Sequence, residues 1–303
     1  MGSNRRSAEN GSDRHSAQAS GEVMGMRIHY CSDIHLEFGD AERPLPSGDV
    51  MVLAGDITLI GALDPADDMY FRHAELRHRT MKFFDDIRQN FDRVFYLIGN
   101  HEAYSYSLTA APKVIRKFLP HVELLNDTVV DLADDTILVG GTLWTDMNGN
   151  SQGAHDVVGR SMNDFRLIHT GKDNVIFTTR AAVKRHRKTL ACIKGAALGH
   201  PDKTIIVATH HAPSYKGINS EHSGSTFNAG YASSLEDFIC EHKNIRHWIF
   251  GHTHIQTSFD IGQCKVVSNS RGYVGREASA RTFEMDRSFE VLSCNSAREK
   301  FVA

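Results

Sequence analysis

Side chains that can bind metal ions recur in this chain at the ends of short apolar runs. The clearest case is Gly99-Asn100-His101-Glu102, which follows an aromatic-rich run typical of a β-strand. Asparagine offers a carbonyl oxygen and histidine an imidazole nitrogen, and both suit a metal ion. Four segments of the same kind are Asp33-Ile34-His35, Gly55-Asp56, His210-His211 and Gly251-His252-Thr253-His254.

The spacing within these segments favours shared metal sites. Asp33 and His35 are separated by one residue, as are His252 and His254. Two residues spaced in this way on an extended segment point in the same direction, so each pair can reach one centre. In open α/β sheets, ligands bind outside the carboxyl ends of the strands. The sequence therefore predicts that the five segments meet at one such edge.

The combined donor set is too large for one metal ion. It holds two carboxylates, one amide and four imidazoles, from Asp33, Asp56, Asn100, His35, the His210-His211 pair, His252 and His254. Two ions fit this set if one carboxylate bridges them. Oxygen and nitrogen donors without a thiolate favour manganese, iron or zinc over copper or calcium. A pair of such ions forms the clamp used in phosphoester displacement.

The order of the five segments closely resembles the calcineurin-like metallophosphoesterase family, from about Arg27 to Asn269 and beyond. The resemblance implies an α/β fold with a four-layer α/β/β/α sandwich, in which two mixed β-sheets carry helices on both outer faces. It also implies two divalent metal ions as cofactors. We expect residues 26–303 to form this single domain, and residues 1–25, which have almost no large apolar side chain, to be a disordered tail.

The resemblance also implies roles for individual residues. One metal would be bound by Asp33, His35 and His254, the other by Asn100, His210 and His252, with Asp56 as the bridging ligand. His101 would stabilise the transition state or protonate the leaving oxygen. His211 remains the alternative to His210 as a ligand.

The expected activity is hydrolysis of a phosphodiester or a phosphomonoester by a metal-bound hydroxide, with the phosphodiesterase favoured. Protein Ser/Thr phosphatases of this superfamily follow the Gly-Asp motif with an Asp-Arg-Gly run. Here Gly55-Asp56 continues into Ile57-Thr58-Leu59, which argues against that branch. Two alternatives remain open, a binding scaffold of the same fold that has lost catalysis and a nuclease.

Substrate contacts are expected from less regular parts of the chain. The segment 142–170 has no clear periodicity, and loops of that length inside a compact domain are usually functional or disordered. It contains Asp164 and Arg166, which could contact substrate or pin the loop through an ion pair. Arg271, shortly after a late strand, is a further candidate for the substrate phosphate.

Alternating and helical periodicity predicts the elements that position these residues. Helices are expected at 73–91, 111–119 and 183–197, and Ser233-x-x-Glu236 predicts a capping box at the start of another. Strands are expected at 27–32, 49–54, 93–98, 122–125, 128–132, 136–140, 204–208, 246–250, 255–261, 264–269 and 281–292.

Composition limits the partners of this 303-residue chain. A net charge of -3 argues against a bulk electrostatic binder of membranes or duplex nucleic acid, so we expect a small phosphoester substrate. The five scattered cysteines suit a reducing compartment, which predicts a cytoplasmic location. No apolar run approaches the roughly 20 residues that span a bilayer. The sequence does not indicate the oligomeric state.

Overall fold

The computed structural model describes residues 22–41, 44–171, 173 and 175–295. Most of the predicted disordered tail, residues 1–21, lies outside this range. Its last residues belong to the first strand, which begins at Glu22 rather than at Arg27. The strand is longer than predicted because its amino-terminal half pairs with the end of the chain, where Glu22 lies opposite Asn295.

The chain contains both strands and helices, and several strands follow one another directly, as β4, β5 and β6 do. The strands are β1 (Glu22–Cys31), β2 (Gly48–Leu53), β3 (Phe91–Leu97), β4 (Glu123–Leu125), β5 (Thr128–Ala133), β6 (Thr136–Gly141), β7 (His169–Thr170), β8 (Val175–Ile176), β9 (Thr204–Thr209), β10 (Ile245–Phe250), β11 (Gln256–Ile261), β12 (Cys264–Asn269) and β13 (Ser288–Asn295). The α-helices are α1 (Asp68–Arg72), α2 (Ala74–Asn90), α3 (Ala111–Phe118), α4 (Met147–Asn150), α5 (Gln152–Ser161), α6 (Asp164–Leu167), α7 (Thr179–Gly199), α8 (Glu236–Glu241) and α9 (Ser279–Thr282).

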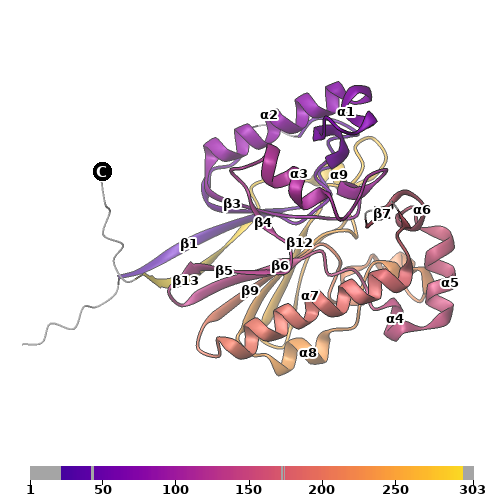
Figure 1. Ribbon diagram of the computed structural model, residues 1–303. Helices are drawn as coiled ribbons and strands as arrows, with labels where there is room; N and C mark the ends of the chain where they lie inside the picture. The colour runs from indigo at the N-terminus through magenta and orange to yellow at the C-terminus, as the bar shows by residue number, and fades with distance from the viewer. Residues whose placement is uncertain (1–21, 42–43, 172, 174, 296–303) are drawn as a thin grey trace, which may run out of the picture.

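Two mixed sheets form the centre of the molecule (Figure 1). The first has the strand order β13-β1-β2-β3-β4, in which only β13 is antiparallel to its neighbour. The second has the order β11-β12-β10-β9-β6-β5, with antiparallel strands at both edges. Buried parallel strands read as nearly continuous apolar runs, as β2 and β9 do.

Three apolar clusters hold the layers together. One lies between the two sheets and includes Val52, Phe95 and Ile249. A second packs the first sheet against α2 and α3, and a third packs α7 and α8 against the second sheet. The predicted single-domain α/β fold with two mixed sheets and helices on both outer faces is therefore confirmed.

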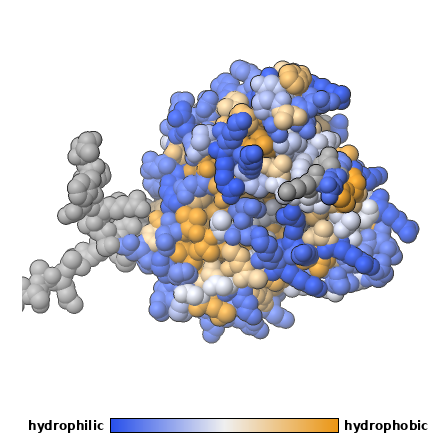
Figure 2. Space-filling model, in the orientation of Figure 1, coloured by the Kyte–Doolittle hydropathy of each residue, from blue (hydrophilic) through white to orange (hydrophobic). Residues whose placement is uncertain are grey.

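The outer surface is mainly hydrophilic in the view of Figure 2, with an apolar area on the side where β5 lies. Strand β5 is an edge strand, and its Val129 is 42% exposed. None of the helices in the described ranges is both long enough and apolar enough to cross a membrane.

Three local predictions were wrong. The segment 142–170 is not irregular, because it forms α4, α5 and α6, whose apolar side chains are too few for a visible period. The last strand begins at Ser288, and α9 precedes it. The predicted capping box is absent from α8, since the Ser233 hydroxyl accepts a hydrogen bond from the Asp146 amide and Glu236 accepts one from Ser214.

One contact between the two sheets has a consequence for stability. The ring of His247 on β10 stacks on Phe289 of β13, with 4.1 Å between ring centres. Burial, reinforced by Arg246 and Lys265, lowers the pKa of His247 to about 4. The folded protein therefore keeps this ring neutral at a pH where the unfolded chain protonates it.

We predict that this histidine destabilises the fold as the pH falls from about 6.5, the usual histidine pKa, to about 4. Unfolding by urea in the presence of a chelator should show a smaller loss of stability over this range for His247→Phe than for the unchanged protein. His222→Phe, at an exposed histidine, is the control. Equal pH dependence in all three proteins would contradict the prediction.

Candidate metal centre

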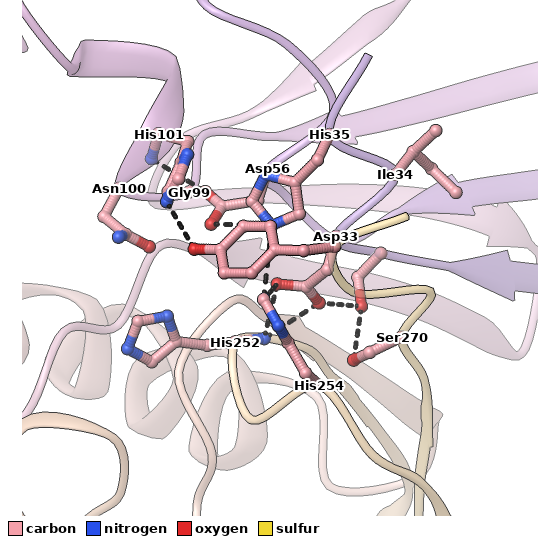
Figure 3. A network of polar contacts seen from close by, with 12 residues as sticks. Asp33, Ile34, His35, Asp56, Gly99, Asn100, His101, His252, His254 and Ser270 are labelled. Carbon is pink, nitrogen blue, oxygen red and sulfur yellow. Dashed lines mark hydrogen bonds and ion pairs between the residues drawn. The ribbon is translucent and has the colours of Figure 1, made fainter. Parts of the chain in front are cut away.

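The predicted ligands converge at the carboxyl ends of β1, β2, β3, β9 and β10. Figure 3 shows those other than His210. Three groups of donors each lie within 4.8 Å of one another. They are Asp33, His35 and His254; His35, Asp56 and His101; and Asp56, His210 and His252. Because the groups share members, they form one continuous donor cluster, almost all of it buried.

The backbone turns sharply where it delivers these side chains. Asp33, His35, Asp56, His252 and His254 all have a positive φ, between 49° and 68°. A non-glycine residue costs about 1–3 kcal/mol in such a conformation, so it persists only where surrounding contacts enforce it. Five strained residues at one site indicate that the turns are shaped for the side chains that they present.

Close backbone approach explains the glycines of the motifs. A Cβ at Gly99 would lie 2.6 Å from the Asp56 nitrogen, and one at Gly55 would lie 2.9 Å from the Gly99 Cα. A Cβ at Gly251 would lie 2.8 Å from the Asp33 carboxylate. These distances are too short for any other residue, so the glycines allow neighbouring strands to bring their ligands together.

Two histidines are oriented by carboxylates behind them. The Nδ1 atoms of His35 and His254 lie 3.0 Å from Glu37 Oε1 and 2.6 Å from Glu277 Oε2 respectively. A carboxylate that accepts a hydrogen bond from Nδ1–H leaves the Nε2 lone pair for a metal. The two Nε2 atoms face each other at 3.2 Å, which places both at the centre of the site.

On the other side of the site, the structure brings His210 rather than His211 into the donor groups. His210 Nδ1 lies 2.8 Å from the Ala54 carbonyl, which again leaves Nε2 facing the cluster. His211 instead contacts the Thr142 carbonyl through its own Nδ1. His252 Nε2 is buried and has no hydrogen-bond partner among the described residues, so a metal would satisfy it.

Asp56 lies between the two sides. Its Oδ2 is 3.9 Å from His35 Nε2, and its Oδ1 is 3.4 Å from His210 Nε2. One carboxylate with its two oxygens directed to different histidines is the arrangement that a bridging ligand requires.

Asn100 is held in one orientation by Asp164 and Tyr104. Its Nδ2 donates to Asp164 Oδ1 at 2.9 Å and to the Tyr104 hydroxyl at 3.1 Å, while its Oδ1 lies 2.9 Å from His210 Nε2. The structure thus places the buried Asp164 against a predicted ligand. This contact gives it a positioning role, and its contact with substrate stays a prediction.

The other predicted substrate residues donate hydrogen bonds to parts of the protein other than the ligand side chains. The exposed Arg166 donates to the Ser161 carbonyl and Asn163, and no ion pair between Arg166 and Asp164 is found in the described structure. The buried Arg271 donates to the carbonyls of Ile34 and Asp40. Neither contact tests whether these residues bind substrate.

Glu102 fastens two of the motifs to each other. Its carboxylate accepts hydrogen bonds from the backbone amides of Asp56 at 2.9 Å, Ile57 at 2.7 Å and Gly99 at 2.6 Å, and from the Tyr96 hydroxyl at 2.7 Å. Burial and the nearby Asp56 raise the pKa of Glu102 to about 7, although these donors favour the carboxylate. Glu102 therefore supports the ligands from behind.

His101 lies beside the cluster with both ring nitrogens engaged. Its Nδ1 is 2.9 Å from Glu37 Oε1, and its Nε2 is 3.2 Å from the Tyr273 hydroxyl. Burial opposes protonation of His101, but Asp56 and Glu37 outweigh it and raise its pKa above the usual value. The ring is therefore set up to carry a proton.

The donors of the site interact strongly with one another. Burial works against both charges, yet Asp33 and Glu277 raise the pKa of His254 to about 10, and His254 lowers the pKa of Asp33 to about 2. A metal would have to displace the proton of His254. The orphaned His252 nitrogen, the oriented lone pairs and the nitrogen and oxygen donor set all fit divalent metal ions.

Several residues of the site were not predicted from the sequence, among them Tyr104, which contacts Asn100. Glu37 and Glu277 orient histidines, and Tyr273 contacts His101. Glu37 could have been found, because it continues the alternation of Asp33 and His35. Tyr273 and Glu277 lie in the irregular segment between β12 and α9, whose position only the folded chain shows.

The sandwich and the donor cluster define a metallophosphoesterase. The chain belongs to the calcineurin-like phosphoesterase family, whose model matches residues 26–256. An uncharacterized protein of Acanthamoeba polyphaga mimivirus is 26% identical over 270 residues, covering 82% of this chain and 92% of that protein. The phosphopantetheinyl hydrolase of Mycobacterium tuberculosis has a similar fold, with a TM-score of 0.56 and 16% identity over 91% of this chain and 98% of that one. Family membership supports a phosphoric ester hydrolase.

We predict that Glu102→Gln strongly destabilises the protein. The amide cannot accept all the hydrogen bonds that the carboxylate accepts, and each buried donor left unsatisfied costs about 1–3 kcal/mol. Urea unfolding measures the loss. Tyr96→Phe removes a single donor to the same carboxylate and should cost only about 0.5–1.5 kcal/mol. Equal stability of the two variants would show that the Glu102 carboxylate does not hold the two motifs together.

Proposed function

We propose that this protein is a dinuclear metal-dependent phosphoesterase that favours phosphodiesters. The observation that carries the proposal is the position of Asp56, whose two oxygens face histidines on opposite sides of the cluster. A site for one metal ion does not require a buried carboxylate between two sets of donors, whereas a site for two ions does.

The residues divide between the two metals by position. Asp33, His35 and His254 would hold one ion, and Asn100, His210 and His252 the other, with Asp56 shared. Manganese, iron and zinc all suit these donors. When bound, two such ions lower the pKa of water towards neutrality and offset the charge that builds up on the phosphoryl oxygens.

His101 acts on the leaving group. Its Nδ1–H is held by Glu37, so a proton on Nε2 can pass to the departing oxygen, which is a poor leaving group without it. Tyr273 occupies this nitrogen at 3.2 Å and must yield it to the substrate. The Glu37 carboxylate stabilises the protonated ring until transfer.

The hydrogen-bond donors of Arg271 are consistent with the proposed preference for a diester. A phosphomonoester carries about two negative charges near neutral pH, while a diester carries one. The guanidinium of Arg271 is directed to the backbone carbonyls of Ile34 and Asp40. These donors are thus engaged with the protein backbone rather than with the additional anionic oxygen of a monoester.

The test uses protein stripped of metal and reloaded with manganese. We expect hydrolysis of bis(p-nitrophenyl) phosphate to exceed that of p-nitrophenyl phosphate. His101→Ala should lower the kcat for the diester by about 10²–10⁴-fold, the usual contribution of a general acid, without reducing metal content.

His222→Ala removes an exposed histidine and should leave kcat unchanged. Turnover of the monoester alone would contradict the proposed preference. Absence of turnover with two metals bound would contradict catalysis and favour the scaffold alternative. Full activity of His101→Ala would contradict the role of that residue.

A further inference from the structure

An exposed aromatic surface borders the metal centre. We call it the aromatic wall and define it as Phe38, Tyr273, Val274 and Arg276. The Tyr273 ring lies 4.6 Å from that of the predicted ligand His35 and 5.0 Å from that of Phe38, measured between ring centres. Phe38 and Val274 are 41% and 38% exposed, so the wall leads from the buried cluster to solvent.

The turn that carries most of the wall is fastened to the metal centre. Glu277 Oε2 accepts a hydrogen bond from the Tyr273 backbone amide at 2.9 Å and lies 2.6 Å from His254 Nδ1. Gly272 has a φ of +78°, and its amide donates to the Asp33 carbonyl. Metal ligands thus fix the position of the wall on both sides.

Arg276 adds a cation to the wall. Its guanidinium lies 5.4 Å from the centre of the Phe38 ring, and the side chain is exposed. In the described part of the chain, no carboxylate forms an ion pair with it. A guanidinium plane beside an aromatic ring forms a surface on which a flat ring system can stack.

We propose that the aromatic wall is the subsite for a planar, nucleobase-like group of the phosphoester. This inference rests on the proposed function, because the phosphate of the ligand would lie at the metal centre while its flat ring lies against Phe38. Single exposed apolar residues are common and need no ligand. Here an exposed ring, a second ring over the metal ligands and a cation adjoin the reacting centre, and residues 273–276 lie outside the matched family segment 26–256.

The proposal is tested by binding rather than turnover. The affinities of the manganese-loaded protein for AMP and for ribose 5-phosphate are measured by isothermal titration calorimetry at low temperature, which slows any turnover of the ligands. Both compounds carry a sugar and a phosphomonoester of the kind that hydrolysis of a diester leaves as product, and only AMP carries a base. We expect AMP to bind more tightly, and Phe38→Ala to weaken AMP about tenfold while leaving ribose 5-phosphate unchanged, in the range that stacking supplies.

Two further variants control the experiment. Phe38→Trp keeps a flat ring and should retain the preference for AMP. Phe71→Ala removes a 75% exposed ring on α1 and should change neither affinity. Equal binding of the two compounds, or equal weakening of both by Phe38→Ala, would overturn the subsite. So would the absence of binding by either compound. The metal count and the diester assay test the proposed hydrolase activity separately. An enzyme that is active but binds AMP and ribose 5-phosphate equally would therefore contradict only the proposed subsite at the aromatic wall.

Discussion

The carboxylate of Glu102 is the contact on which the rest of the site depends. It accepts hydrogen bonds from backbone amides in the turn after β2 and in the turn after β3, and so joins the ends of two neighbouring strands. Those turns carry Asp56 and Asn100, which the proposed mechanism assigns to the shared ligand and the second metal. A small shift between the turns would separate the two halves of the donor cluster.

The same logic extends across the sheets. Positive φ angles at residues such as Asp33 and His252 cost energy that buried hydrogen bonds must offset. The His252 amide, for example, donates to the Asp33 carboxylate and joins a turn of the second sheet to one of the first. Because the two sheets share the apolar layer between them, the carboxyl ends of their strands stay close together, and the five ligand-bearing segments need not be held individually.

Much of this could be predicted from sequence, and the exceptions have physical reasons. The motifs could be recognised because each follows a buried parallel strand. The apolar run of such a strand identifies it in the sequence and so locates the polar residues at its carboxyl end. The helices of residues 142–170 were missed, since they are short and bury few side chains. Ser233 matched a capping pattern, but tertiary contacts drew its hydroxyl to the Asp146 amide. Tyr273 and Glu277 reach the site through a turn that has no periodicity.

The most direct test of the account is a count of metal ions bound per chain after equilibration with manganese or zinc, by elemental mass spectrometry. The account predicts two ions for the unchanged protein, and one or fewer for Asp56→Asn, because the shared ligand is weakened for both ions. A single ion per chain in the unchanged protein, or two ions retained by Asp56→Asn, would contradict a dinuclear centre bridged by Asp56.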